Sequence, residues 1–237
     1  METAIATFIA IICGGLLNMA AAVWAEHRRR ARLKLSIETP LPDIPLQVVS
    51  PTGRFAGVFR VVRVHVSNDP QGFFDRWMRS PALQCRAIIS FHNISDGKEI
   101  FGRAMQGRWS RALQPTPIPV VDGNGNIVLH VLDPEKMGID SRIDIYPGDS
   151  ELLDIAVRFQ GDQDCYGWNN ETFFKQPIGK NPDWLLGKDR FLVKIVINST
   201  GQRCEGVFRL VNDGPQNSFR LDKADAAETV RVKAAST

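Results

Sequence analysis

Residues 191–213 read FLVKIVINSTGQRCEGVFRLVND, and this stretch decides the fold class. Apolar side chains recur at every second position in both of its halves, which is the period of a strand that buries one face. They are Phe191, Val193, Ile195 and Ile197, followed by Cys204, Gly206, Phe208 and Leu210. The turn-forming run Ser199-Thr200-Gly201 separates the halves, so the stretch predicts a β-hairpin.

Four other stretches share this two-residue period. They read GVFRVVRVHVSN (57–68), LQCRAIISFHN (83–93), PIPVVDGNGNIVLHVLD (117–133) and SELLDIAVRFQ (150–160). The third contains an Asp-Gly-Asn-Gly-Asn turn between two short strands. About seven or eight strands at this spacing predict a mainly β fold, an antiparallel β-sandwich over residues 55–222. Residues 223–237 have no sustained apolar period, and we expect a flexible tail there.

The N-terminal region predicts one transmembrane helix over residues 1–26. Residues 4–24 read AIATFIAIICGGLLNMAAAVW, carry no charge, and have the length of a helix that crosses a hydrocarbon layer of roughly 30 Å. Basic residues follow as a collar, which consists of Arg28, Arg29, Arg30, Arg32 and Lys34. Because basic residues flank the cytoplasmic end of a span, we expect a single-pass membrane protein whose β domain faces the cytoplasm.

A cleaved signal peptide is the competing interpretation of this region, since Ala20-Ala21-Ala22 supplies the small residues of a cleavage site. However, no basic residue precedes the apolar run, and the collar would follow the cut almost at once. In the membrane interpretation the collar also attracts anionic headgroups of the lipid bilayer. One row of the helix favours a homo-oligomer through close helix packing. The row consists of Ala6, Ala10, Gly14, Asn18 and Ala22.

Residues 27–54 form the predicted basic collar and proline-rich linker. Prolines occupy positions 40, 42, 45 and 51. Because proline fixes φ and has no N–H to donate, we expect either an extended linker or the edge of a sheet.

The charge distribution argues against nucleic-acid binding. The formal net charge is +3, and residues 1–34 account for all of it, so the rest of the chain is formally neutral. A protein that binds nucleic acid usually presents lysine and arginine on its folded domain, where they neutralise phosphates.

The sequence carries no signature of a catalytic or cofactor site. The patterns GxSxG, GxxxxGK[ST], GxGxxG and HExxH are absent. Histidines are scattered, with His65 and His92 on the polar faces of predicted strands. Asp162 opens a run that resembles a calcium loop, but Tyr166 and Phe173 occupy later ligand positions, so an ordinary polar loop is favoured. We therefore expect no cofactor, no metal and no enzymatic activity.

Three cysteines lie in the predicted β domain, namely Cys85, Cys165 and Cys204. An odd number without metal-ligand spacing predicts buried free thiols in a reducing compartment.

Aromatic residues in one loop-rich segment give the candidate partner-binding site. Residues 164–187 read DCYGWNNETFFKQPIGKNPDWLLG, and the candidates are Tyr166, Trp168, Phe173, Phe174 and Trp184. Loop aromatics are enriched at binding surfaces, but the same residues can instead cap the core of a sandwich. A second candidate surface has the same two interpretations. It comprises Phe73, Phe74, Trp77 and Trp109 with Arg76, Arg79 and Arg108.

The stretches VRVHVSN (62–68), SPALQCRAIISFHN (80–93) and the hairpin of residues 191–213 resemble prokaryotic membrane-anchored immunoglobulin-like domains of the adhesion type. The resemblance spans residues 55–212 and implies an immunoglobulin-like sandwich with a general binding or scaffolding role. It carries over no catalytic residue. Antibody-type domains have their cysteine pair and core tryptophan closer together than Cys85, Trp109 and Cys204, so their disulfide is not implied.

These patterns together favour a non-catalytic, membrane-tethered β-sandwich that binds a protein partner or scaffolds a complex at the cytoplasmic face. An exported surface domain with an adhesion or carbohydrate-binding role is the first alternative. An enzyme is the second.

Overall fold

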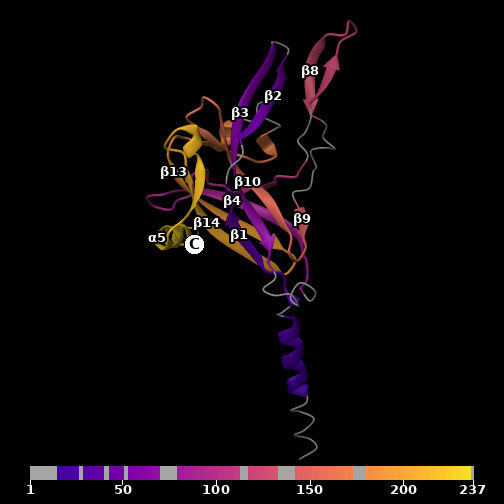
Figure 1. The fold of residues 1–237 in the computed structure, drawn as a ribbon, viewed down its shortest axis with the longest axis vertical. Coiled ribbons are helices and arrows are strands. Elements are labelled where there is room, and N and C mark those ends of the chain that lie inside the picture. The colour runs from indigo at the N-terminus through magenta and orange to yellow at the C-terminus, as the bar shows by residue number, and fades with distance from the viewer. Residues whose placement is uncertain are drawn as a thin grey trace, which may run out of the picture.

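The fold is mainly β and consists of two antiparallel sheets that pack face to face (Figure 1). The computed structural model describes residues 15–26, 29–39, 43–50, 53–69, 79–112, 117–132, 142–172 and 180–235.

The first sheet has seven strands, which pair in the order β1-β3-β10-β11-β12. Strand β2 pairs with β3, and β6 pairs with β10. The strands are β1 (Leu33–Ile37), β2 (Asp43–Ser50), β3 (Gly53–Asn68), β6 (Arg108–Trp109), β10 (Ser150–Phe159), β11 (Cys165–Gly167) and β12 (Leu185–Leu186).

The second sheet has six strands, in the order β15-β14-β13-β4-β5, and β9 pairs with β4. They are β4 (Ala82–Asn93), β5 (Met105–Gln106), β9 (Arg142–Ile145), β13 (Arg190–Ser199), β14 (Gln202–Val211) and β15 (Arg220–Lys223). A separate hairpin pairs β7 (Pro117–Val121) with β8 (Ile127–Leu132). Short 3-10 turns occupy η1 (Pro182–Trp184) and η2 (Gln216–Ser218).

The hairpin predicted from residues 191–213 is confirmed as β13 and β14. Its register pairs Phe191 with Leu210 and Ser199 with Gln202. The apolar positions of this hairpin and of β4 face those of β3 and β10 across one core, as the two-residue period requires. The core includes Val62, Val64, Val66, Ile89, Phe91, Leu153, Ile155, Val193, Ile195 and Ile197, each fully buried.

The predicted linker is a pair of strands, so the start of the β domain at residue 55 was wrong. Strand β1 pairs with β3 from Leu33↔Asn68 onward, and its apolar residues pack against the core. Strand β2 pairs with β3 and with no other described strand, so the alternative of a sheet edge holds. An edge tolerates Pro45 because the missing N–H faces away from the ladder.

The predicted flexible tail is also corrected. The first residue of this segment, Lys223, is the last residue of β15. Further along the segment, a helix, α5, extends over Ala226–Ala235. Asp225 and Glu228 cap the helix reciprocally, each accepting the other's backbone N–H at 2.8 Å. Val232 is fully buried beneath the helix. One buried apolar side chain gives no detectable period, so tertiary contacts decided this helix.

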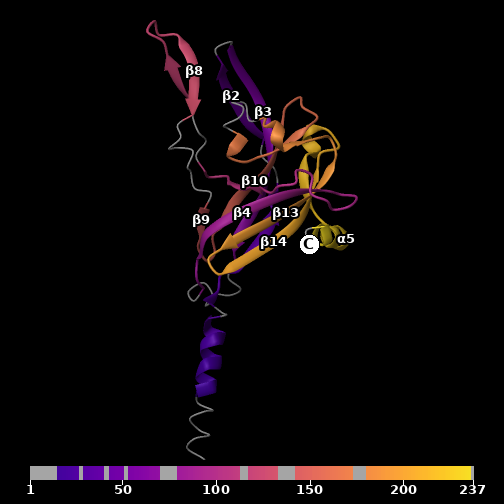
Figure 2. The same ribbon diagram turned by 180° about the vertical axis from the view of Figure 1, so that it is seen from behind.

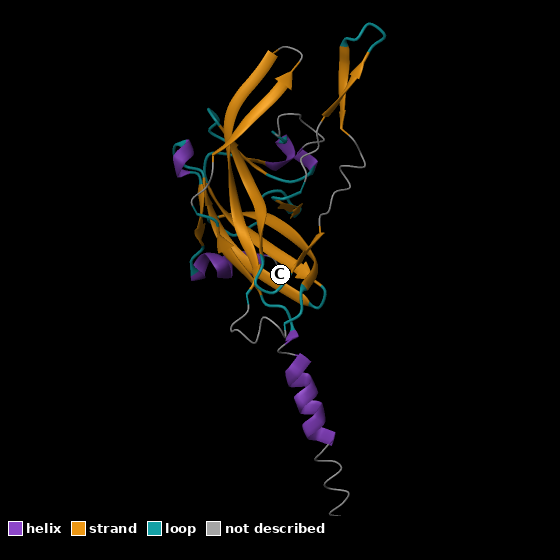
Figure 3. Cartoon of the chain, turned by 45° about the vertical axis from the view of Figure 1, so that its right-hand side comes forward, coloured by secondary structure: helices purple, strands orange, loops and turns teal. Residues whose placement is uncertain are grey.

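A helix occupies residues 15–26 and lies at one end of the sandwich (Figure 3). No helix in the described parts of the chain combines the length and hydropathy needed to cross a membrane. Residues 1–14, which make up the first half of the predicted span, lie outside the described residues.

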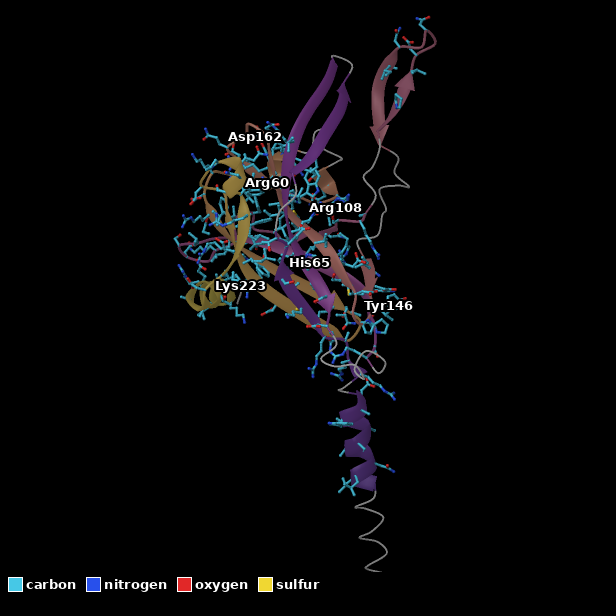
Figure 4. The ribbon with its side chains drawn as sticks, viewed as in Figure 1. Arg60, His65, Arg108, Tyr146, Asp162 and Lys223 are labelled. Carbon is cyan, nitrogen blue, oxygen red and sulfur yellow. The ribbon has the colours of Figure 1, made fainter. Side chains whose placement is uncertain are left out.

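The β2–β3 and β7–β8 hairpins extend from the opposite end of the sandwich (Figure 3). In Figure 4, Tyr146 lies toward the end with the helix and Asp162 lies toward the end with the hairpins. The molecule therefore has a helical end and a hairpin end.

Candidate functional site

The aromatic residues of the predicted binding site lie mainly in the interior. Trp184 is 1% exposed and Trp168 is 6% exposed, and Tyr166 is half-buried. The Trp184 Nε1–H donates to Glu171 Oε2 at 3.1 Å, which satisfies its polar atom. Phe173 and Phe174 lie outside the described residues. The burial of both tryptophans favours the interpretation in which they cap the core.

Trp168 belongs to a small aromatic cluster on the outer face of the seven-stranded sheet. Its members are Phe59, Val61, Val157, Phe159 and Trp168, with Tyr166 packed against them. Phe59 pairs with Phe159 across strands β3 and β10, and their ring centroids lie 6.0 Å apart. Since neighbouring Val62 faces the main core, these side chains must face outward. A satellite core therefore closes this part of the face.

Residues of the second candidate surface are buried as well. Trp109 is 1% exposed and lies in the main core, and Arg79 is buried. Arg108 is 2% exposed, and its Nη2 donates to the carbonyl of Ala112 at 2.7 Å. Phe73, Phe74, Arg76 and Trp77 lie outside the described residues.

Arg108 is part of a buried ionic network with Asp154 and Arg63. Arg63 Nε donates to Asp154 Oδ1 at 2.7 Å, and Arg108 Nε lies 3.9 Å from Asp154 Oδ2. Burial raises the pKa of the Asp154 carboxyl, while the two guanidiniums oppose that shift. Burial also lowers the pKa of Arg108. Two cations share one anion here, so the network closes the rest of this outer face with structural charges.

The collar joins the helix to the sandwich. Its backbone is tied in, since the Ser80 N–H donates to the Arg29 carbonyl at 2.6 Å and the Arg32 N–H donates to Asn68 Oδ1 at 3.0 Å. The side chains of Arg29, Arg30, Arg32 and Lys34 are exposed. Lys34 makes one long ion pair with Asp69, at 3.8 Å. Arg28 lies outside the described residues. The described collar side chains are therefore open to solvent.

The thiols are free, as expected. Cys85 and Cys165 are buried and Cys204 is half-buried. Burial raises the pKa of the Cys85 thiol to about 11 and that of Cys165 to about 12. Both therefore stay protonated and unreactive at neutral pH.

The outer face of the six-stranded sheet carries a feature that the sequence did not single out, an open groove of about 470 Å³. Residues of β4, β13 and β14 line it, together with residues of the loop between β4 and β5 and the end of α5. Figure 2 shows these three strands and α5. The lining residues are Ile88, Ser90, His92, Glu99, Ala104, Lys194, Val196, Asn198, Arg203 and Ala235. We call this feature the outer groove.

His92 and Ser90 form a hydrogen-bonded pair on the floor of the outer groove. His92 Nδ1 lies 2.9 Å from the Gly97 carbonyl, and Nε2 lies 2.8 Å from Ser90 Oγ. A carbonyl only accepts, so Nδ1 carries the proton and Nε2 accepts from the Ser90 hydroxyl. Burial lowers the pKa of His92, and the nearby charge of Lys194 adds to this effect. The imidazole is therefore neutral and fixed in one tautomer.

Register explains how these residues meet. Ser90 pairs with Lys194 and His92 pairs with Leu192 across β4 and β13. Alternation then places Ser90, His92, Lys194 and Asn198 on the face opposite the core. The two-residue period that predicts the core-facing residues of β4 and β13 therefore also predicts that these residues face outward. The signal that would have found the groove is the pairing of β4 with β13, which are nearly a hundred residues apart.

The β7–β8 hairpin is the other exposed feature. Its strands pair with each other and with no other described strand. Apolar side chains on it are open to solvent, namely Val120, Val121, Ile127 and Val128, at 38–63% exposure. The segment 117–132 contains one aspartate, Asp122, and one histidine, His130, but no glutamate, lysine or arginine. Asp122 accepts backbone N–H bonds within its own turn at 2.8–2.9 Å.

Within the described residues, no group of three or more histidine, cysteine, aspartate or glutamate side chains could hold a metal ion. Comparisons with protein-family models, curated proteins and solved structures give no match to this chain.

Proposed function

We propose that this protein is a non-catalytic, membrane-tethered β-sandwich that binds a protein partner through its hairpin end. The β domain then stands at the cytoplasmic face of the membrane, with the N-terminal helix as anchor. An immunoglobulin-like identity belongs to the same proposal and is supported by the two antiparallel sheets packed over one core.

The observation that carries the proposal is the exposed apolar hairpin β7–β8. A two-stranded ribbon is only marginally stable in water by itself, and unpaired strand edges accept further strands. Natural edges are usually protected by charges, whereas the one formal charge of this hairpin, with His130 neutral, is that of Asp122. Val121 and Val128 are 56% and 63% exposed, so a partner strand or apolar surface would bury them.

The anchor is supported by sequence and by exposure. Residues 4–24 carry no charge, and the helix over residues 15–26 exposes its large apolar side chains. They are Leu16, Leu17, Met19, Val23 and Trp24, at 56–71% exposure. Exposed apolar surface of this extent is typical of a helix that contacts a membrane or another protein. Self-association through Gly14 and Asn18 remains part of the proposal.

Site-specific photo-crosslinking in living cells tests the partner-binding role. A photoreactive phenylalanine analogue at Val128 should give a discrete adduct with one partner. The same analogue at Tyr146, which is 55% exposed at the helical end, is the matched control. The adduct should disappear when Val121→Asp is introduced, because that change places a charge in the interface. Equal adducts at both positions, or none at Val128, would exclude the hairpin as the binding element.

Thiol labelling tests the topology. Cys204 is the half-buried thiol, and Cys85 and Cys165 react only after denaturation. A membrane-impermeant maleimide should label Cys204 after permeabilisation and not in intact cells. Labelling in intact cells would move the β domain to the outside and favour the adhesion alternative.

A further inference from the structure

The outer groove has the volume of a small-molecule site. It is concave, it holds about 470 Å³, and polar groups from three strands converge on it. Binding sites for small molecules have this size, with a few placed polar groups among apolar walls. Its lining residues belong to β4, β13, β14, α5 and the loop between β4 and β5, and include none from the β2–β3 or β7–β8 hairpins.

Two side chains of the groove carry hydrogen-bond donors for which the described part of the chain supplies no acceptor. Among the described residues, none accepts a hydrogen bond from the Lys194 ammonium or the Asn198 amide, and no carboxylate lies within 4 Å of the ammonium. Both side chains are half-buried on outward positions of β13, and Val196 lies on the outward position between them. A partly buried cation is stable only where water or an anion solvates it.

The remaining polar groups agree with an anionic ligand. Arg203 lines the groove, and its side-chain partner among the described residues is Glu205, at 3.4 Å. Its remaining N–H donors are therefore available to a ligand. The hydroxyl proton of Ser90 is committed to His92, which leaves lone pairs but no free donor there. Glu99 is the acid among the lining residues, and Lys194 and Arg203 outnumber it.

The groove also has room for more than a head group. Ile88, Val196, Ala104 and Ala235 give it apolar surface beside the charged positions. An inorganic phosphate would fill a small part of the volume and leave this surface wet. The ligand therefore needs a ring-sized or sugar-sized body attached to its charged group.

We propose that the outer groove binds a small soluble organic anion, whose carboxylate or phosphate is held by Lys194, Asn198 and Arg203. Its body lies over Ile88 and Val196. This site includes no residue of the N-terminal helix or of the β7–β8 hairpin, so its test is independent of the proposed function.

Calorimetric titration of the full chain in neutral detergent with phenyl phosphate tests this site. Phenyl phosphate joins a dianionic group to a ring, and benzyl alcohol is the neutral probe of similar size. Phenyl phosphate should bind saturably at one site, and benzyl alcohol should not. Lys194→Gln should weaken binding about tenfold or more, because a charge-assisted hydrogen bond is lost. Lys188→Gln, an exposed lysine outside the groove, should leave it unchanged.

Two further measurements complete the test. One checks that the variants remain folded, and the other asks whether the bound anion is a soluble molecule or a lipid headgroup. Lys194→Met keeps the apolar stem without the charge and should behave like Lys194→Gln, with the thermal midpoint of both variants near that of the parent. Added phosphatidylglycerol should not compete, because the proposed ligand is soluble. The proposal is overturned by absent or unsaturable binding, by equal affinity of Lys194→Gln, by equal loss in Lys188→Gln, or by competition from the lipid.

Discussion

The outer faces of the two sheets can be compared strand by strand. On the seven-stranded sheet, an aromatic cluster around Trp168 and the Arg63–Asp154–Arg108 network close the face. On the six-stranded sheet, Lys194 and Asn198 occupy equivalent outward positions but stay half-buried in an open groove. The outward positions of β3 and β10 include the apolar Phe59, Val61, Val157 and Phe159, whereas those of β13 include the polar Lys194 and Asn198. The difference teaches that alternation identifies the inward face, whereas long-range packing decides whether the outward face is closed.

The largest expected effect comes from opening the closed face. Asp154→Ala should lower the free energy of unfolding by about 3–5 kcal/mol, because the buried Arg108 and the half-buried Arg63 would lose their shared anion. Chemical denaturation measures this change.

Glu151→Ala on the same strand is the control for Asp154. Glu151 pairs with Arg111 at 2.9 Å, but the Arg111 side chain is 61% exposed. Its loss should cost at most about 1 kcal/mol. Equal costs for the two variants would show that the buried network is no more important than a surface ion pair.

The second prediction concerns α5, which borders the open face. Gly97 has φ of +73°, and a Cβ there would lie 2.7 Å from the Arg231 carbonyl of α5. Gly97→Ala should therefore cost about 2–3 kcal/mol and loosen α5, since both backbone strain and a backbone clash result. Hydrogen exchange of the α5 amides measures the loosening.

Gly102→Ala separates strain from clash. Gly102 has φ of +62° with no atom within 4 Å of an added Cβ. It should cost about 1 kcal/mol and leave α5 exchange unchanged. Faster α5 exchange in Gly102→Ala would assign the effect to the loop and not to the contact.

A smaller effect is expected from the ion pair that holds α5 on the sheet. Arg209 Nε and Nη2 donate to the two Glu228 oxygens at 2.9 and 2.7 Å. These bonds lower the pKa of Glu228 below its usual 4.5. A lowered carboxyl pKa stabilises the fold above the unfolded pKa, and this stabilisation is lost as the pH falls through the folded value.

The docking of α5 should therefore weaken below about pH 4.5. Glu228→Gln should weaken it by about 1–2 kcal/mol at neutral pH and flatten that acid dependence. Hydrogen exchange across this pH range checks both. A steep acid dependence that persists in Glu228→Gln would assign the titration to another group.

The smallest expected effect belongs to His92 in the open face. Its pKa is lowered from 6.5, so the folded protein prefers the neutral imidazole. This preference stabilises the fold fully above pH 6.5, and the stabilisation is lost as the pH falls toward the folded pKa. The Cε1–H resonance of His92 should titrate below pH 6.5, and His92→Gln should remove the corresponding slope of stability. A midpoint at or above 6.5 would contradict a buried neutral imidazole.

The inward-facing side chains were predictable, and the outward environments were not. Val62, Val64 and Val66 were assigned to one face from their period, and they lie in the core. Trp168 and Trp184 were candidates for an exposed surface, yet the packing of β10 against β11 and the η1 turn buries them. No local pattern distinguishes a loop tryptophan that caps a core from one that binds a partner.

The candidate sites show the same division. Exposure of the β7–β8 hairpin follows from its pairing with no other described strand, which its sequence does not reveal. Ser90 and Lys194 are separated by 104 positions in the chain and become neighbours through the register of β4 and β13. Neither residue had a local reason to be selected.

The sequence by itself determined the strand period, the hairpin of β13 and β14, the free thiols and the neutral charge of everything after Lys34. These properties depend on residues close together in the chain or on composition alone. Only the tertiary structure decided the pairing of β1 and β2 with β3, the docking of α5 and the shape of the outer groove. The physical reason is that burial and charge pairing depend on contacts between distant segments, and such contacts exist only after the sheets have assembled.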